Sequence, residues 1–388
     1  MSFEVPEGVR PIRERVKQFI EERIYPVEHV LEERGEEESG ATMRRLMNEA
    51  KAAGLWALGH PVEIGGQGMP FLDYVYVNEV VGRSEFAQVC LGTHSLQDSI
   101  MLNLHSSPEW REKYLRPLVA GEIFPSFAMT EPDVASSDPT QLQTRAVLDG
   151  DDWVINGQKI WATGAGANNN VISVYVKTDP KVHYRQGMSL FLVDKDAPGL
   201  KLRKLEMLGR RCVGTYELFF DDVRVPADRL IGGENKGWEC VLSGLQVERI
   251  ASTAGYCGGA QAVVDLALQY AKDRKQFGRP IGEFQSIAHM LADMQTEVDA
   301  ARMLMWRAAW MLARGRDALR EISMAKLFGS ETYVKVANMG MQIFGAYGYN
   351  MEFDMQRHFR DARSTTIGAG TSQMQRNLIA GLMGLKVH

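Results

Sequence analysis

Apolar residues change their spacing twice along this sequence, and the double change restricts the folds that it can form. In the first part they recur three or four positions apart, as at Val9, Ile12 and Val16, which predicts amphipathic helices. Near Phe124 they begin to occur in short runs rich in β-branched and aromatic residues, separated by Gly, Asp and Asn, which predicts strands. From Trp238 the helical spacing returns. The chain should therefore form helices, then strands, then helices.

This order predicts a multidomain α+β protein with three units. We expect an N-terminal helical domain at residues 1–122, a middle β-barrel or β-sandwich at 123–233 and a C-terminal helical bundle at 234–388. Pro280 is the last proline, so the stretch after it lacks the strongest helix breaker. Apolar residues between Ile287 and Leu312 alternate steps of four and three. This seam fits a helical bundle or a subunit interface.

Local patterns within these units predict individual elements. Helices are expected at residues 9–31, 42–53, 71–82 and 108–118. Strands are expected at residues 144–148, 153–156, 159–162, 171–177, 189–193, 200–205, 216–220 and 222–228. The Gly-Asp-Asp sequence at 150–152 and the Asn-Gly sequence at 156–157 each predict a hairpin turn.

Composition narrows the classes of protein to consider. Of the 388 residues, 45% are hydrophobic and 24% charged, as in ordinary globular proteins, and the net charge of −5 gives no reason to expect nucleic-acid binding. The four cysteines form neither a CxxC pair nor a zinc spacing, which favours reduced thiols, a cytoplasmic location and no metal site. No apolar run approaches the ~20 residues that span a bilayer, so we expect no membrane span. Residues 1–15 match neither a signal nor a transit peptide.

A strand-like run followed by the sequence Thr-Glu-Pro-Asp-Val-Ala-Ser-Ser-Asp, residues 130–138, stands out within the β region. Pro132 ends the strand, and the hydroxyl groups and free N–H groups after it suit a flat polar ligand. Alone, this segment is equally well an ordinary turn between strands. Four further motifs accompany it in the order Trp161-Ala-Thr163, Arg274-Lys-Gln-Phe277, Gln342-Ile-Phe-Gly345 and Gly370-Thr-Ser-Gln373.

Together and in this order, these segments resemble the flavin-binding motifs of the acyl-CoA dehydrogenases over nearly the whole chain. The resemblance implies that family's fold, with a C-terminal four-helix bundle. It also implies an FAD-dependent enzyme that dehydrogenates an acyl-CoA thioester to the trans-2-enoyl-CoA. Hydride would pass to N5 of FAD, and electrons would leave to an electron-transfer flavoprotein. The expected assembly is a homotetramer with flavin sites shared between subunits.

The resemblance also assigns residues to FAD. In the family, groups equivalent to Met129, Thr130 and Ser137 lie near the flavin ring, and Trp161 and Thr163 lie against its other side. The cofactor-binding residues that the resemblance implies in the C-terminal unit are Arg274, Phe277, Gln285, Gln342, Gly345, Thr371 and Gln373. Arginine suits a diphosphate because its planar fork donates several hydrogen bonds to phosphate oxygens. The turn is one residue longer than usual, so Ser136 is an alternative to Ser137. Barrel packing for Trp161 and a solvated helix end for Arg274 are the structural alternatives.

Most relatives carry the base that removes the substrate's α proton as a Glu before the final helix, where this chain has Ala369. A methyl group cannot accept a proton. Glu248 occupies the position from which a different glutamate serves in isovaleryl- and long-chain-type members, so Glu248 is the expected base. Arg249, Ser137 and Gly370 are the expected substrate contacts. The alternatives are a surface carboxylate at Glu248 and a helix salt bridge at Arg249.

Enolate stabilisation could survive the loss of the late glutamate. In the family the backbone N–H at the position of Ala369 donates to the thioester oxygen, and a backbone donor is unaffected by side-chain changes. Two other functions stay open at this point. One is a flavin-binding subunit that shapes a partner without catalysing, which Ala369 favours. The other is an oxidase that passes electrons to oxygen.

Overall fold

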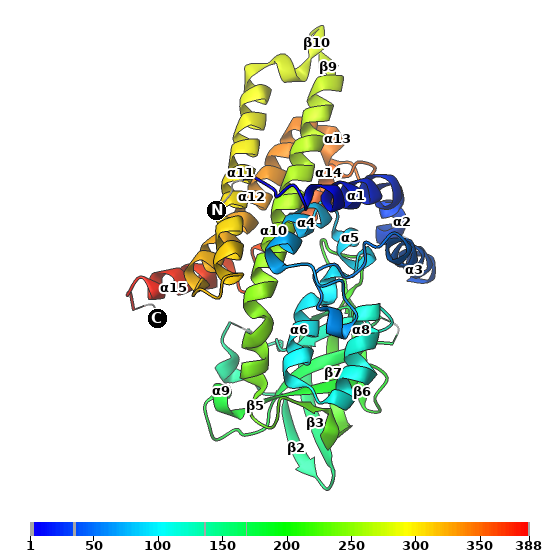
Figure 1. Ribbon diagram of the computed structural model, residues 1–388, viewed down its shortest axis with the longest axis vertical. Helices are drawn as coiled ribbons and strands as arrows, with labels where there is room; N and C mark the ends of the chain where they lie inside the picture. Colours follow the sequence, from blue (N-terminus) through cyan, green and yellow to red (C-terminus); the bar gives the residue numbers. More distant parts are fainter. Residues whose placement is uncertain (1–3, 34–35, 136, 168, 387–388) are drawn as a thin grey trace.

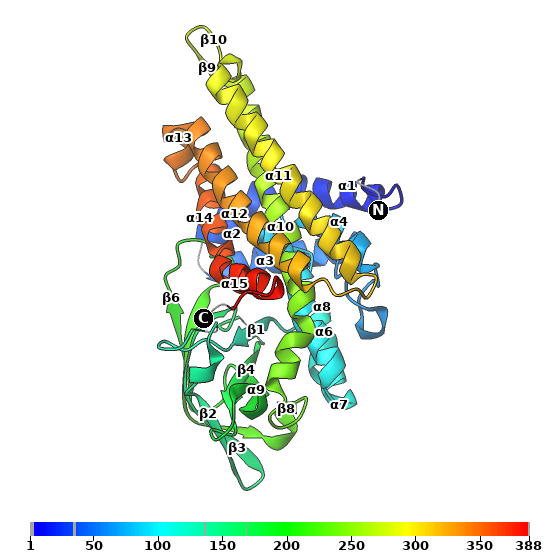
Figure 2. The same cartoon turned by 90° about the vertical axis from the view of Figure 1, so that its left-hand side faces the viewer.

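The computed structural model of the protein describes residues 4–33, 36–135, 137–167 and 169–386. The molecule is elongated: a β-sheet occupies one end, a pair of long helices reaches the other, and shorter helices pack at mid-height (Figure 1). Turning the molecule by 90° shows the C-terminal helices running side by side away from the sheet (Figure 2). The fold is that of an α+β multidomain protein with helical, β and helical parts in sequence order.

The first part is helical, as predicted. Its α-helices are α1 (Arg10–Phe19), α2 (Glu28–Glu33), α3 (Glu36–Ala52), α4 (Phe71–Val81), α5 (Glu85–Cys90), α6 (Leu96–His105), α7 (Pro108–Trp110) and α8 (Arg116–Ala120). The single helix expected at 9–31 is wrong in detail, because a π-helical turn at Ile20–Ile24 and a 3-10 turn at Tyr25–Val27 separate α1 from α2. Pro26 explains the break, since proline supplies no N–H to the helix.

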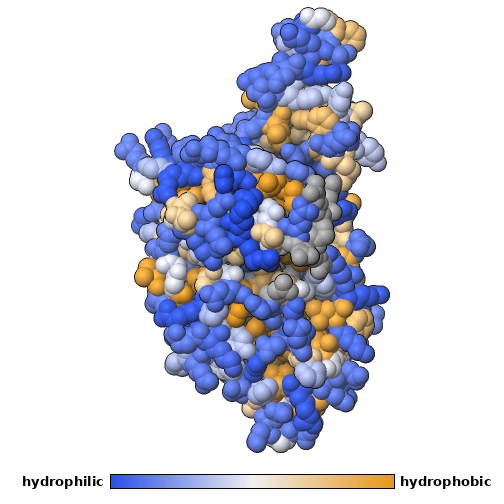
Figure 3. Space-filling model, turned by 90° about the vertical axis from the view of Figure 1, so that its right-hand side faces the viewer, coloured by the Kyte–Doolittle hydropathy of each residue, from blue (hydrophilic) through white to orange (hydrophobic). Residues whose placement is uncertain are grey.

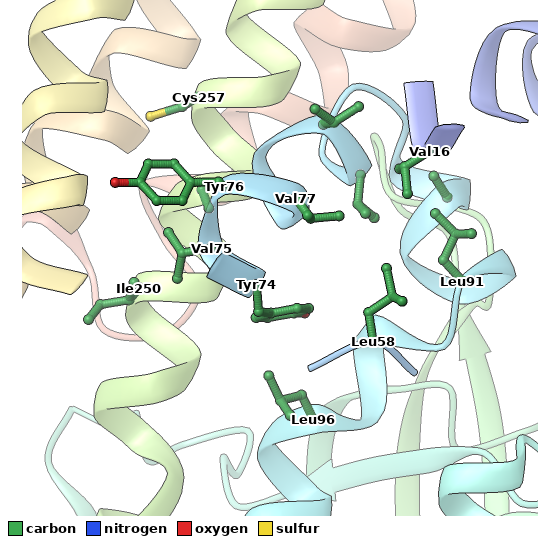
Figure 4. Packing of buried hydrophobic residues seen from close by; sticks show 14 of the residues in the cluster. Val16, Leu58, Tyr74, Val75, Tyr76, Val77, Leu91, Leu96, Ile250 and Cys257 are labelled. Atoms are coloured by element: carbon green, nitrogen blue, oxygen red, sulfur yellow. The ribbon is translucent and has the colours of Figure 1, made fainter. Parts of the chain in front are cut away.

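Helix α4 lies at the centre of the largest hydrophobic core. Residues 74–81 are all buried, so this helix presents no solvent-facing side. Figure 4 shows Tyr76 and Val75 directed toward Cys257 and Ile250 of the long helix α10 (Gly237–Asp273). Other side chains of the same cluster approach from α1, α5 and α6, which brings the N-terminal helices and the C-terminal bundle onto one shared core.

The middle part forms one mixed sheet. Its strands are β1 (Pro125–Ala128), β2 (Arg145–Asp149), β3 (Asp152–Thr163), β4 (Val171–Lys177), β5 (Met188–Asp194), β6 (Leu200–Leu205), β7 (Thr215–Pro226) and β8 (Leu230–Ile231), with a short helix α9 (Tyr184–Gly187) before β5. The order is β6-β7-β3-β2-β4-β5-β8, and β1 pairs in parallel with β4. Most neighbours are antiparallel. Strands β4 and β5 are buried on both faces, whereas β3 alternates between buried and more exposed residues along much of its length.

One predicted hairpin forms and the other does not. The turn at Gly150 joins β2 to β3, with Leu148 paired to Trp153. The expected turn at Asn156–Gly157 is wrong: both residues lie inside β3, which is a single twelve-residue strand. Gly157 has φ 142° beside a shift in the pairing with β7, and a Cβ there would lie 2.6 Å from Oγ1 of Thr144. Glycine therefore serves a bulge and a close approach here rather than a turn.

The last part is a bundle around α10, with α11 (Gln285–Leu312), α12 (Leu319–Phe344), α13 (Ala346–Tyr349), α14 (Met355–Thr365) and α15 (Ser372–Leu382). The predicted seam of α11 is buried at Met294, Val298, Ala301 and Met305. A two-stranded ribbon, β9 (Lys275–Gln276) and β10 (Arg279–Pro280), joins α10 to α11 at the far end of the molecule (Figure 1).

The face of the molecule shown in Figure 3 has the hydrophilic character that the composition predicts. The face in Figure 3 carries mainly hydrophilic side chains, with apolar residues in small groups. In the part of the chain that the structure describes, no helix combines the length and apolar character needed to cross a membrane.

Glycines on α10 set how closely α4 packs, and this makes a stability prediction. A Cβ on Gly258 would lie 1.7 Å from the carbonyl oxygen of Glu79, so Gly258→Ala must push α4 and α10 apart. We expect a loss of roughly 1–3 kcal/mol in the free energy of unfolding, measured with urea. Gly381→Ala in α15 is the matched control, because a Cβ there meets nothing within 4 Å and alanine favours helices. Equal stability of Gly258→Ala and the parent would contradict the close contact.

Candidate functional site

The turn after β1 is held by a buried acid–base pair. The carboxylate of Glu131 accepts hydrogen bonds from the N–H groups of Gln143 (2.7 Å) and Thr144 (2.9 Å) and from Nζ of Lys159 (2.9 Å). Lys159 is fully buried and also donates to the carbonyl oxygen of Met129 at 3.0 Å. Burial opposes the charge of Glu131, but Lys159 and these hydrogen bonds lower its pKa overall. The pair fixes the chain on both sides of Thr130, so Glu131 has a structural role.

Beside this turn, strand β3 presents an exposed indole. Trp161 has φ 65°, an outlying value for a bulky residue, at an irregularity in the pairing of β3 with β7. Its side chain is 54% exposed. The neighbouring Ile160 N–H donates to the carbonyl oxygen of Thr130 at 2.9 Å, which brings the two segments together. Among the described residues, no acceptor meets the N–H of Thr130. Such a group next to an exposed aromatic ring is suited to a planar ligand with acceptor atoms.

The other residues expected near the flavin ring are accessible. Thr163 ends β3 with an exposed side chain, and its hydroxyl group lies 3.4 Å from that of Thr215. Ser137 is exposed in the turn. Its alternative, Ser136, lies outside the described residues. The next residue, Asp138, accepts a hydrogen bond from the N–H of Thr140 and begins a 3-10 turn.

A second group of predicted residues meets where α10 approaches the loop between α14 and α15. Arg249 is buried, and its Nε donates to the carbonyl oxygen of Ala369 at 3.4 Å. Glu248, the preceding residue, is half-buried. Ala369 has φ 54° and Gly370 φ 87°, so two successive residues turn in the left-handed region. No acceptor meets the N–H of Ala369 among the described residues, which leaves this donor free for a ligand.

A lysine that the sequence analysis did not single out supports this loop. Nζ of Lys326, from α12, donates to the carbonyl oxygens of Thr365 (3.0 Å) and Gly370 (2.7 Å), and Nε2 of Gln375 donates to Gly370 at 3.1 Å. Burial, and then the charge of Arg249, lower the pKa of Lys326 to about 8. A signal was available: Lys326 lies four residues after Ile322 within the predicted C-terminal helical bundle, a spacing that places both residues on one face of a helix. A lysine there must have partners.

Burial also determines the electrostatics of Glu248. Burial and, to a smaller extent, nearby Asp98 raise the pKa of this carboxyl group, while the charges of Arg249, Lys326 and Arg210 lower it, and the resulting pKa is about 7. A carboxyl group with such a pKa is close to half ionised near neutral pH and can accept a proton. After the loop, the hydroxyl group of Thr371 accepts from the N–H of Met374 at 3.2 Å and caps α15, while Gln373 is exposed in its first turn.

The remaining predicted residues gather at the far end of the bundle. Arg274 ends α10 with an exposed side chain, and its guanidinium lies 5.5 Å from the ring centre of Tyr347. Phe277 is 93% exposed at the ribbon, and Gln285 is exposed at the start of α11. The exposed Gln342 precedes Gly345, which ends α12 with φ 60° and ψ −136°. Only glycine adopts these angles readily, so this position needs glycine.

The two groups are far apart within one chain. Arg274 is 26 residues beyond Glu248 on the same helix, which corresponds to roughly 40 Å at 1.5 Å per residue. Figures 1 and 2 agree that the ribbon and the sheet lie at opposite ends of α10. One chain therefore brings together Glu248, Arg249, Ala369 and Gly370, and separately the residues around Arg274. Within the described ranges there is no cluster of three or more His, Cys, Asp or Glu residues that could hold a metal ion.

Comparison with known proteins assigns the family. Three family models match in order: the acyl-CoA dehydrogenase N-terminal domain at residues 6–122, the middle domain at 126–223 and the C-terminal domain at 235–383. The chain belongs to the acyl-CoA dehydrogenase family. It is therefore an oxidoreductase of acyl-CoA thioesters, with FAD as its cofactor.

Similarity to individual members of the acyl-CoA dehydrogenase family extends over almost the whole chain. The protein named "Probable acyl-CoA dehydrogenase YngJ" from Bacillus subtilis is 37% identical, over 98% of this chain and 99% of that protein. Subunit CarC of the caffeyl-CoA reductase-Etf complex from Acetobacterium woodii is 35% identical, over 96% and 97%. The structure of glutaryl-coenzyme A dehydrogenase with glutaryl-CoA has a TM-score of 0.90 at 32% identity, over 100% and 98%.

Residues of this acyl-CoA dehydrogenase fit the chemistry of FAD. The free N–H of Thr130 and the exposed indole of Trp161 suit a flavin ring with acceptor atoms at its edge. Gly345 has no side chain, and the space beside it is open to a ligand, since nothing lies within 4 Å of the position that a Cβ would occupy. Arg274 is exposed and offers a guanidinium to a diphosphate.

The loop before α15 yields a prediction about Lys326. Lys326→Met keeps the length of the side chain but removes the donor to the carbonyl oxygens of Thr365 and Gly370. Gly370 keeps its hydrogen bond from Gln375, whereas Thr365 loses this donor, and an orphaned buried acceptor costs about 1–3 kcal/mol. We expect lower stability and faster hydrogen exchange, measured by mass spectrometry, in the peptide covering residues 365–375. Lys335→Met on the same helix is the control, since Lys335 is an exposed residue that pairs with Glu297. Unchanged exchange in that peptide would show that Lys326 does not hold the loop.

Proposed function

We propose that this acyl-CoA dehydrogenase removes hydrogen from the α and β carbons of an acyl-CoA thioester, giving the trans-2-enoyl-CoA, with Glu248 as the base. The observation that carries the proposal is the location of Glu248. Its half-buried carboxyl group has a pKa of about 7 and lies on α10 directly before Arg249, which donates to the carbonyl oxygen of Ala369 in a loop without a carboxylate of its own. A base whose pKa is close to 7 is partly ionised at physiological pH, so it can accept the α proton.

Each residue around Glu248 has a distinct part in the proposed reaction. Glu248 takes the α proton as the α C–H bond breaks. The free N–H of Ala369 donates to the thioester oxygen as that oxygen gains negative charge. Bound FAD supplies the acceptor for the hydride that leaves the β carbon, so the substrate loses a proton and a hydride and gains one C=C bond. Arg249 and Lys326 keep the loop in place through its carbonyl oxygens. Gly370 and Ser137 are the proposed substrate contacts beside them.

We also propose that the cofactor site is shared between subunits of a homotetramer. The separation of roughly 40 Å along α10 between Glu248 and Arg274 exceeds the length of one extended FAD molecule. A flavin held near Thr130 and Trp161 of one subunit would therefore meet Arg274, Phe277 and Gln285 of another. Met129, Thr163, Gln342, Gly345, Thr371 and Gln373 complete the proposed FAD contacts. The exposed aromatic residues at the ribbon support a contact with a neighbouring subunit, since Phe277 is 93% exposed.

For the electron acceptor, we propose an electron-transfer flavoprotein. Support comes from the relative CarC, whose name describes a subunit of a complex with Etf.

We further propose a cytoplasmic location, because the four cysteines are free thiols and suit a reducing compartment. The division of the chain at residues 122 and 233 stays a prediction.

Replacing Glu248 tests the base. Glu248→Gln keeps size and polarity but cannot take a proton, so we expect flavin bleaching by acyl-CoA under anaerobic conditions to slow by about 10²–10⁴-fold. Binding of acyl-CoA should change much less. In the parent, the rate should rise with pH and level off above about 7, because only the ionised carboxylate accepts the proton and burial raises its pKa to about 7. Glu239→Gln, an exposed change in the first turn of α10, is the control.

Two further results decide between the open functions. Ala369→Glu in the Glu248→Gln protein should restore bleaching if the thioester lies between the two positions. A parent that retains FAD but is bleached by no acyl-CoA would overturn the proposal in favour of a non-catalytic subunit, and fast oxygen uptake during turnover would identify an oxidase. A Glu248→Gln variant as fast as the parent would remove Glu248 as the base.

Arg274→Ala tests the shared cofactor site. A charge-assisted contact with phosphate is worth roughly 1.5–3 kcal/mol, so we expect FAD to dissociate about 10- to 100-fold more readily while the fold is retained. Fluorescence of released flavin measures the affinity, and circular dichroism checks the fold. Arg316→Ala is the control, because Arg316 is an exposed arginine over Trp310 near the opposite end of α11. Unchanged FAD affinity in Arg274→Ala would remove Arg274 from the site.

A further inference from the structure

A second carboxylate lies beside Glu248 and takes no part in the proposed reaction. Asp98 is in the first turn of α6, and α6 packs directly against the first half of α10. The contact is close at Gly244, one turn before Glu248, where a Cβ would lie 2.9 Å from Cγ of Gln97. Asp98, the residue after Gln97, is thus held near Glu248, and its negative charge raises the pKa of the Glu248 carboxyl group.

The positively charged side chains near Glu248 and Asp98 bind other groups. Arg249 and Lys326 donate to the carbonyl oxygens of the loop before α15, and Arg210 pairs with Glu85 at 2.6 Å. Apart from its own backbone N–H, Asp98 has no hydrogen-bond or ion-pair partner within the described ranges. It is half-buried, so its carboxylate can accept a hydrogen bond from a ligand as well as from water.

Apolar side chains lie beside Asp98 on one face of α6. Met101 and Leu102, three and four residues after Asp98, are buried in the same core cluster as Tyr175 of β4. Tyr175 is completely buried, and its ring centre lies 4.8 Å from that of the part-exposed Phe127. The charges of Asp98 and Glu248 both raise the pKa of its hydroxyl group. A carboxylate at the edge of an apolar wall and near the proposed base can select among acyl groups.

Stabilisation of α6 does not account for Asp98 by itself. An acidic residue in the first turn of a helix interacts favourably with the helix dipole, which lowers the pKa of the carboxyl. Burial instead raises the pKa of Asp98 to about 6. The helix end therefore does not keep this carboxyl group at its ordinary pKa, and a ligand that donates a hydrogen bond to it would stabilise its charged form.

We propose that Asp98 is a specificity-determining residue that accepts a hydrogen bond from the acyl group, so that the preferred substrates are acyl-CoAs with a donor such as a hydroxyl or ammonium group on the acyl chain. An acyl chain that ends in a carboxylate is disfavoured, because it would meet Asp98 as a like charge. This inference rests on the proposed dehydrogenation at Glu248 and specifies the substrate class for that same site.

The test compares acyl groups of equal length in the FAD-loaded protein. Anaerobic flavin bleaching is measured with ω-hydroxyacyl-CoAs, unsubstituted acyl-CoAs and ω-carboxyacyl-CoAs over a series of chain lengths. At one length the hydroxyl form should have the highest second-order rate constant and the carboxylate form the lowest. Asp98→Asn should reduce the preference for hydroxyl over carboxylate by roughly 10- to 100-fold, the effect of losing a charge-assisted hydrogen bond. Asp73→Asn, in the first turn of α4, is the matched control.

The outcomes separate this inference from the proposed function. If Asp98 only perturbs Glu248, Asp98→Asn shifts the pH profile equally for all substrates and leaves the preference unchanged, which would overturn the inference while dehydrogenation stands. Fastest bleaching by unsubstituted acyl-CoAs at every length would also overturn it. Loss of bleaching with every substrate in the parent would instead count against the proposed function. Flavin absorbance of Asp98→Asn confirms that the variant is folded and loaded.

Discussion

The close packing of α10 against its neighbours is the constraint on which the rest of this structure depends. Glycines along this helix let other elements approach to distances that any side chain would prevent: Gly244 meets α6, Gly258 meets α4, and Gly259 meets Tyr333 of α12. Such contacts bury a single helix among three others, and the gain comes from dispersion and from apolar area removed from water. Glu248 and Arg249, the proposed base and a proposed substrate contact, lie between these glycines, so the same packing holds them in place.

The second determinant is the distribution of charge around the loop before α15. Two buried cations, Arg249 and Lys326, are directed at carbonyl oxygens rather than at carboxylates. Each satisfies backbone acceptors in a loop that forms neither helix nor strand, which keeps the left-handed turn at Ala369 and Gly370 in place. The carboxylates Glu248 and Asp98 are then left with weak compensation, and burial raises the pKa of both. Carboxyl groups perturbed in this way are candidates for proton transfer, which supports the proposed role of Glu248.

Sequence patterns alone determined much of this protein. Periodicity gave the helix, strand and helix order, and the strand at Val171–Lys177 and the strand at Leu200–Leu205 have the expected bounds. Side-chain spacing is a local property, since burial on one face of an element repeats with the period of that element. The order of the motifs was also enough to indicate the family. Some motif residues meet a requirement of the backbone, such as glycine at Gly345, and others supply a chemical group, such as the guanidinium of Arg274.

Tertiary structure decided the features that depend on residues distant in sequence. The Asn-Gly pair at 156–157 has the composition of a turn, but pairing with β7 and the approach of Thr144 keep it within β3. Lys326 and Asp98 were not identified as site residues because nothing in their own segments reveals what faces them. Lys326 is separated by 44 residues from Gly370, and Asp98 lies on a different helix from Glu248. Sequence determines which groups are available and which elements carry them. Which groups come within a few ångströms of one another is a property of the packed chain, because packing sets the burial and the partners that fix each group's hydrogen bonds and pKa.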